Sequence, residues 1–225
     1  YWARMELEGQ FTSVRFQTDP RRGWGVRVAF DSVGLTLPLP AIEDRAEPLR
    51  MTEVGGALRF EPERIEIEKP LVGRVAGLKY RVDGTIEGYR EDAPFHVSVR
   101  TDAFDVPEAP QYIYALPRPV REGFEMLAPS GRLRVSLAVW RDARGGSIDY
   151  QGAATVLDGR GRYYQFPYEL TNCRGMVRFD REQIRVLNLT GNTSGGGSAT
   201  INGRIAPPGD TAAVDLTITA VDVPF

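Results

Sequence analysis

Apolar and polar residues alternate along many stretches of this chain with the two-residue period of β-strands. Residues 58–60 read Leu-Arg-Phe and residues 95–99 read Phe-His-Val-Ser-Val. Side chains at every second position of a strand point to the same face of a sheet. The alternation therefore predicts antiparallel strands with one apolar face and one polar, largely charged face.

The same pattern occurs twice in the sequence. Residues 175–224 repeat the design of residues 56–107, so that Gly56 corresponds to Gly175 at an offset of 119 residues (175 − 56). A fixed-period match of this kind is the sequence signature of a repeat protein. The chain is therefore predicted to be an all-β tandem repeat of antiparallel meander units.

The bounds of the repeats follow from the segment before each copy. Gly131 opens a strand pattern that matches the one starting at Gly9, at an offset of 122 residues (131 − 9). This match predicts an initial segment at residues 1–8, a first unit at 9–130 and a second unit at 131–225. The prolines within residues 32–48 lack a backbone donor and predict a sheet edge or loop there.

One stretch breaks the strand period. Apolar residues fall at helical spacing at Leu116, Val120, Phe124 and Leu127, and a Pro-Ser-Gly sequence follows. This spacing predicts a short helical connector near residues 108–130. The second unit ends before such a connector would appear.

Composition removes several classes of function. The net charge is −2, with 28 basic and 30 acidic side chains, so no basic field favours nucleic acid. Cys173 is the single cysteine and His96 the single histidine, which excludes an internal disulfide and gives no support to a metal site or a Ser-His-Asp triad. No motif places a pair of carboxylates, so we predict no catalytic residue, no metal, no cofactor and no enzymatic activity.

Two further features of the sequence concern membrane-spanning segments and the two ends of the chain. No apolar run approaches the roughly 20 residues that a membrane-spanning helix needs. The chain begins at Tyr1 without a methionine and ends within the repeat motif. We therefore expect it to be a segment of a longer protein.

The second unit carries a fixed order of short segments: residues 166–170 (Phe-Pro-Tyr-Glu-Leu), 175–179 (Gly-Met-Val-Arg-Phe), 184–189, a glycine run at 195–197, 202–205 (Asn-Gly-Arg-Ile) and 222–224 (Asp-Val-Pro). This order resembles modules of the AsmA-like family, which belongs with the bridge-like lipid transfer proteins. The stretch 116–131, followed by a strand, also resembles the link between modules in that family. The resemblance covers nearly the whole chain and rests on patterns of apolar positions and glycines.

The resemblance implies a fold, a location and a function. Such proteins stack repeating β-groove units into a curved, groove-like sheet whose apolar face carries phospholipid acyl chains between membranes. It implies a protein of the bacterial periplasm and cell envelope that is membrane-anchored in its full-length form. The implied partners are phospholipid acyl chains, neighbouring repeat units of the same parent chain and a membrane reached through regions outside this sequence.

The alternation selects the residues that would line such a groove. An acyl chain exposed to water costs about 0.8 kcal/mol per CH₂ group, so a continuous apolar face can hold it without a specific recognition site. The predicted lining residues are Ile65, Ile67, Val97, Val99, Val177, Phe179, Ile184, Val186, Leu216 and Ile218.

Two other interpretations remain open at this point. The same side chains would form an ordinary filled core if a second sheet or the connector covered them, and the chain would then be a structural or interaction module of a large envelope assembly. A weaker alternative is a carbohydrate-active β domain with paired carboxylates in a polar cleft.

Overall fold

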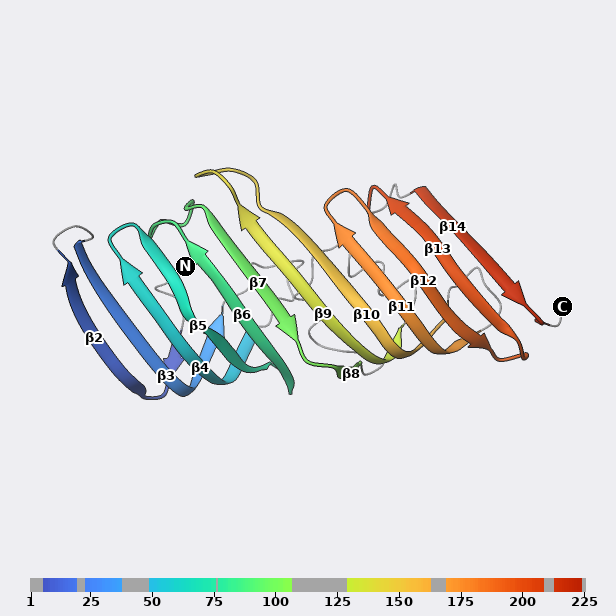
Figure 1. Cartoon of the computed structure of the whole chain (residues 1–225), viewed down its shortest axis with the longest axis horizontal. Coiled ribbons are helices and arrows are strands. Elements are labelled where there is room, and N and C mark those ends of the chain that lie inside the picture. The colour runs from blue at the N-terminus through green and yellow to red at the C-terminus, as the bar shows by residue number, and fades with distance from the viewer. Residues whose placement is uncertain are drawn as a thin grey trace. The chain divides into compact units, whose positions relative to one another are not determined.

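The computed structural model describes residues 6–19, 23–37, 49–75, 77–106, 129–162, 169–208 and 213–223. These residues form fourteen strands and no helix, which confirms the predicted all-β class (Figure 1). The strands are β1 (Glu6–Glu8), β2 (Phe11–Asp19), β3 (Gly23–Leu37), β4 (Leu49–Glu61), β5 (Arg64–Val75), β6 (Leu78–Ile86), β7 (Phe95–Thr101), β8 (Phe104–Val106), β9 (Ser130–Arg141), β10 (Asp149–Gly161), β11 (Leu170–Asp180), β12 (Ile184–Thr193), β13 (Ser198–Ala206) and β14 (Ala213–Val221).

The chain divides into two compact units. Unit 1 consists of Tyr1–Thr101 and Leu137–Tyr150, and unit 2 consists of Asp102–Ser136 and Gln151–Phe225. The division cuts through β9 and β10, so the bounds of these two units differ from those of the repeats predicted from the sequence.

Unit 1 is an antiparallel meander. Each strand from β2 to β7 pairs with the next one in sequence, and β1 pairs with the last part of β3 while β2 pairs with its first part. This order confirms the predicted meander. Antiparallel neighbours can be joined by short turns, such as the one at residues 62–63 between β4 and β5.

Unit 2 repeats this arrangement. Strands β10 to β14 pair in sequence order, and the short strand β8 pairs with the beginning of β9 through Val106 opposite Gly131. The glycine run at residues 195–197 lies in the turn between β12 and β13.

Next to the turn of the hairpin, β4–β5 in unit 1 and β11–β12 in unit 2 have the same register. Phe60 lies opposite Ile65 in β4–β5, and Phe179 lies opposite Ile184 in β11–β12. All four residues obey the sequence offset of 119 (179 − 60). The repeat is therefore a repeat of strand pairing as well as of residue pattern.

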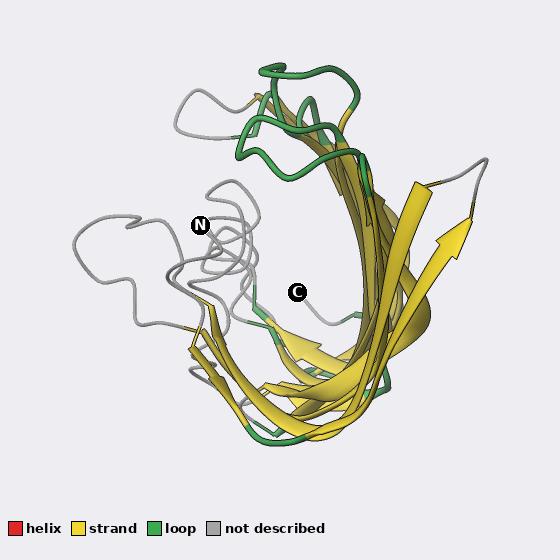
Figure 2. Ribbon diagram, turned by 90° about the vertical axis from the view of Figure 1, so that its left-hand side faces the viewer, coloured by secondary structure: helices red, strands yellow, loops and turns green. Residues whose placement is uncertain are grey.

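The long strands are bent along their length (Figure 2). Register shifts occur at equivalent places, between Thr52 and Gly55 in β4 and between Thr171 and Arg174 in β11. Extra residues in one strand of a pair form β-bulges, which bend a strand and increase its twist. The curvature that the resemblance implies thus has a local cause in each unit.

The loop or edge expected at residues 32–48 is wrong for residues 32–37, and residues 38–48 lie outside the described residues. Residues 32–37 continue β3 instead of forming a loop or an edge, because Leu35 pairs with Met51 of β4 and with Leu7 of β1. Ser32 has a φ of 55°, which indicates a β-bulge at this point of β3 and lets the strand continue beyond it.

The predicted helical connector lies almost wholly outside the described residues. Of the span 108–130, only residues 129 and 130 are described, and Ser130 already begins β9.

Candidate functional site

The strand registers place the apolar residues of each unit on one face of its sheet. Residues directly opposite each other in an antiparallel pair share a face. In unit 1, Leu58 lies opposite Val28 on one side and opposite Ile67 on the other, and Val82 lies opposite Val99. We call this side of each sheet the apolar face.

The predicted lining residues of unit 1 all lie on its apolar face. Ile65 and Ile67 are in β5, where Ile65 is buried and pairs with Ile86 of β6. Val97 and Val99 are in β7, and both are half-buried.

The predicted lining residues of unit 2 lie on the equivalent face. Val177 of β11 lies opposite Val186 of β12, and Ile218 of β14 lies opposite Ile201 of β13. The remaining three also share this face: Phe179, Ile184 and Leu216.

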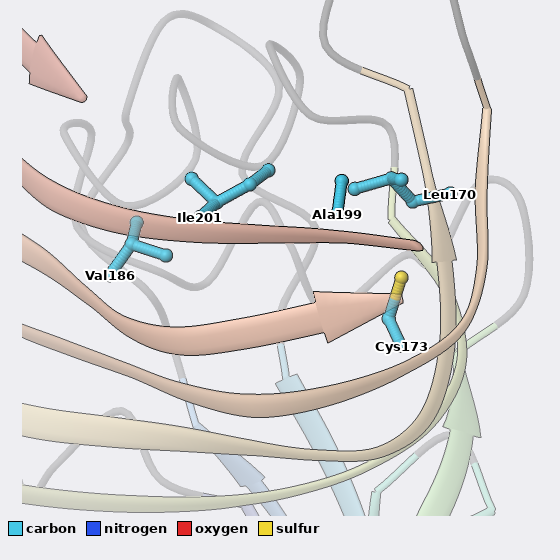
Figure 3. Packing of buried hydrophobic residues seen from close by; sticks show 5 residues of the cluster. All are labelled: Leu170, Cys173, Val186, Ala199 and Ile201. Atoms are coloured by element: carbon cyan, nitrogen blue, oxygen red, sulfur yellow. The ribbon is translucent and has the colours of Figure 1, made fainter. Parts of the chain in front are cut away.

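A buried cluster marks the apolar face of unit 2. Its side chains lie on the inner side of the bend in the strands (Figure 3). The buried members are Leu170, Cys173, Val186, Ala199 and Ile201, and the half-buried residues against them are Val156, Leu189, Leu216 and Ile218. Three predicted lining residues therefore belong to or pack against this cluster.

Unit 1 has an equivalent cluster. Its buried members are Met51, Val54 and Tyr80, and the half-buried residues against them are Phe30, Leu35, Leu71, Val75, Val82 and Val99. Of the four lining residues predicted in unit 1, Val99 is the one in this cluster.

Sequence reasoning missed several central members of both clusters for one reason. Met51 and Val54 are three residues apart and so fall out of the two-residue period, as do Leu170 and Cys173. Left-handed residues lie inside both gaps, Glu53 with a φ of 53° and Asn172 with 52°. An Asn or Gly inside a three-residue apolar gap is a sequence signal for a bulge, but a glutamate gives no such signal.

The apolar face of unit 1 is exposed at β2. Phe11, Val14 and Phe16 share this face by their pairing with β3, and their exposed fractions are 56%, 63% and 64%. All strands of the described residues belong to one sheet order, so no second sheet among them covers the apolar faces. Contiguous exposed apolar side chains of this kind mark sites that bind lipids, proteins or other apolar partners.

The opposite face of unit 1 is charged. Glu68 accepts a hydrogen bond from Arg59 Nη2, with 2.8 Å to its Oε1, and a second one from Arg27. The hydrogen bond from Arg59, followed by that from Arg27, lowers the pKa of Glu68. This solvated face accounts for the arginines and glutamates that alternate with the apolar residues.

Two ionisable groups interrupt the apolar faces. Burial raises the pKa of the Tyr80 phenol in unit 1 to about 12. Burial, with smaller effects of Asp158 and Glu169, raises the pKa of the Cys173 thiol in unit 2 to about 11. Both groups are therefore neutral at physiological pH.

The described residues contain no cluster of His, Cys, Asp and Glu that could hold a metal ion. His96 is exposed on the charged face, and its ring stacks on Trp140 with 6.2 Å between centroids. Within the described parts of the chain there is also no apolar helix of membrane-spanning length.

Comparisons with protein-family models, with curated proteins and with solved structures found no match to this chain.

Proposed function

We propose that this protein binds lipid acyl chains on the apolar faces of its repeats, as a non-enzymatic segment of a longer bacterial envelope protein that moves phospholipid between membranes. One observation carries the proposal: each repeat presents an apolar face, and no second sheet among the described strands lies over it. The resemblance to the AsmA-like family supplies the cargo, the envelope location and the membrane anchor in the full-length chain.

The energetics favour acyl chains as the ligand. Each CH₂ group moved from water to an apolar surface gains about 0.8 kcal/mol. Exposed side chains such as Phe16, and half-buried ones such as Val97, can supply this surface along many strands. A ligand held by area alone needs no catalytic or charged group, which agrees with the neutral apolar faces.

The first test is mass spectrometry of an organic extract from the natively purified protein, beside a control β protein handled identically. We expect phospholipid in near-stoichiometric amount. A second measurement adds fluorescent phospholipid to the purified protein, so that lipid lost during purification does not decide the outcome.

A charged side chain introduced on the apolar face should reduce the binding of phospholipid. Val97→Glu should weaken phospholipid binding about tenfold or more, because a carboxylate in an apolar environment is costly. Ser98→Glu is the matched control, since it lies in the same strand and points to the charged face. Val177→Glu makes the corresponding test in unit 2. Retained lipid binding by a folded Val97→Glu protein would contradict the proposal.

A second candidate is a structural or interaction module with a filled core. The burial of Val54, which is 1% exposed, favours it, as does the pairing of β14 on one side only among the described strands. Unfolding by Val97→Glu and a lipid-free extract would together favour this candidate.

A further inference from the structure

One polar group in the buried cluster of unit 1 is not accounted for by packing. Tyr80 is 5% exposed, yet its hydroxyl has no hydrogen-bond partner among the described residues. Buried tyrosine hydroxyls usually find a partner, because leaving one unpaired costs free energy. Tyr80 shares its cluster with Met51 and Val54, neither of which offers a strong acceptor in its side chain.

The fold holds this hydroxyl at a defined place. Tyr80 of β6 lies opposite Gly73 of β5, and a Cβ atom at residue 73 would lie 2.5 Å from the Tyr80 hydroxyl oxygen. The phenol therefore lies over the glycine backbone, where any larger residue would displace it. The phenol is already neutral at physiological pH with its ordinary pKa of 10.0, and burial raises this pKa further, so the group is a hydrogen-bond donor there.

Unit 2 lacks this group at the equivalent place. Ala199 corresponds to Tyr80 at the offset of 119 (199 − 80) and lies opposite Gly191, which follows Gly73 at an offset of 118 (191 − 73). The phenol is therefore a property of unit 1 and not of the repeat backbone.

We propose that the Tyr80 hydroxyl donates a hydrogen bond to the ester carbonyl of an acyl lipid bound on the apolar face of unit 1. This inference rests on the proposed function. The ester carbonyl is the acceptor that directly adjoins the acyl chains of a diacyl lipid. A chain lying on the apolar face thus brings an acceptor to the one phenol of the cluster.

The ligand must reach a hydroxyl that is closed to solvent in this structure. Met51 packs in the same cluster, and an unbranched side chain with three rotatable bonds adapts most easily to a new neighbour.

The experiment compares two phosphatidylcholines with the same alkyl chain length, one with ester linkages and one with ether linkages. The ether lipid lacks the carbonyl and keeps the chains and the headgroup. Wild-type protein should bind the ester lipid about threefold to tenfold more tightly, which is the range of one hydrogen bond. Tyr80→Phe should remove this preference and leave binding of the ether lipid unchanged.

Tyr89→Phe is the matched control. The Tyr89 hydroxyl donates to the backbone carbonyl of Glu61 and belongs to an exposed residue outside the cluster. This variant should keep the full preference for the ester lipid.

Each other outcome overturns the inference. Equal binding of the two lipids by the wild type, or a preference that Tyr80→Phe retains, would contradict the hydrogen bond and leave the proposed function standing. Binding of neither lipid would refute the proposed function and the inference with it. A lower urea midpoint for lipid-free Tyr80→Phe would show that the hydroxyl already has a partner within the protein.

Discussion

The buried clusters of the two units occupy equivalent strands and carry different side chains. Met51 and Leu170 correspond closely, but Val54 is replaced by Cys173. The largest difference is an aromatic phenol at residue 80 in unit 1 against a methyl group in unit 2. The backbone positions are thus kept while the chemistry of the apolar face varies from one repeat to the next.

The glycines below the clusters follow the same rule. A Cβ atom at Gly73 would meet the Tyr80 hydroxyl oxygen at 2.5 Å, and one at Gly191 would meet the Cys173 sulfur at 2.8 Å. Each unit therefore uses a glycine to let a different side chain lie flat against the sheet. The repeated backbone thus fixes where space is available, and the side chains of each copy fill that space differently.

The largest expected effect on stability, and the strongest test of this equivalence, is the substitution of Gly84 or Gly203 by alanine. A Cβ atom at Gly84 would lie 2.3 Å from the carbonyl oxygen of His96, and one at Gly203 would lie 2.1 Å from that of Asp215. Both clashes are with backbone, so alanine must displace the neighbouring strand. Gly84→Ala should lower the free energy of unfolding by about 3 kcal/mol, measured by urea denaturation.

Gly203→Ala should cost less, because its neighbour β14 pairs on one side only among the described strands and can shift outward. Gly145→Ala is the control: it has a φ of 67° but no atom within 4 Å of the added Cβ, so it reports backbone strain alone. Equal losses for Gly84→Ala and Gly145→Ala would contradict the steric explanation.

Much of the fold could be predicted from the sequence because its signals are local. The alternation at residues 95–99 gives a strand, and the offset of 119 residues between Gly56 and Gly175 gives the repeat. The extension of β3 through Leu37 was not predictable, because Ser32 adopts a left-handed conformation without a glycine or asparagine to indicate it.

The next largest expected effect is a difference between the units in how their stability depends on pH. The Cys173 thiol has a folded-state pKa of about 11 against an ordinary value of 9.0. Above pH 9 the unfolded chain loses this proton while the folded protein keeps it, so unfolding releases a proton. Stability from this site is complete below pH 9 and is lost as the pH rises toward 11, by about 2 kcal/mol in total.

Cys173→Ala should remove this loss between pH 9 and 11 in urea titrations. The phenol of Tyr80 acts in the same direction but only above its ordinary pKa of 10, since its folded-state value is about 12. Unit 1 should therefore begin to lose stability at a higher pH than unit 2. A wild type and a Cys173→Ala variant with identical pH profiles would refute the assignment.

The candidate site was less predictable than the fold. All ten proposed lining residues lie on the apolar faces, as the two-residue period of the strands predicts. Their role in lipid binding stays a prediction. Tyr80 was recognisable as an apolar-face position, yet its unpaired hydroxyl depends on Gly73, a partner seven residues away in the adjacent strand. Such a contact depends on the bulged register between β5 and β6, which residue patterns do not specify.

The smallest effect concerns the charged faces, where the units differ again. Glu68 lies between Arg27 and Arg59 in unit 1, whereas its counterpart in unit 2 is Leu187 (187 − 68 = 119). Glu68→Gln should destabilise the protein by about 0.5 kcal/mol, because solvent-exposed ion pairs contribute little. The effect should fade at high salt and at low pH, since a lowered carboxyl pKa gives stability that is lost as the pH falls through the folded-state value.

Glu63→Gln, in the exposed turn between β4 and β5, is the matched control and should have a smaller effect at every salt concentration. A salt-independent loss from Glu68→Gln would mean that Glu68 acts through packing of its side chain and not through its charge. A loss of several kcal/mol would mean that the two arginines hold β3, β4 and β5 together, and the charged face would then distinguish unit 1 from unit 2 more strongly than the apolar face does.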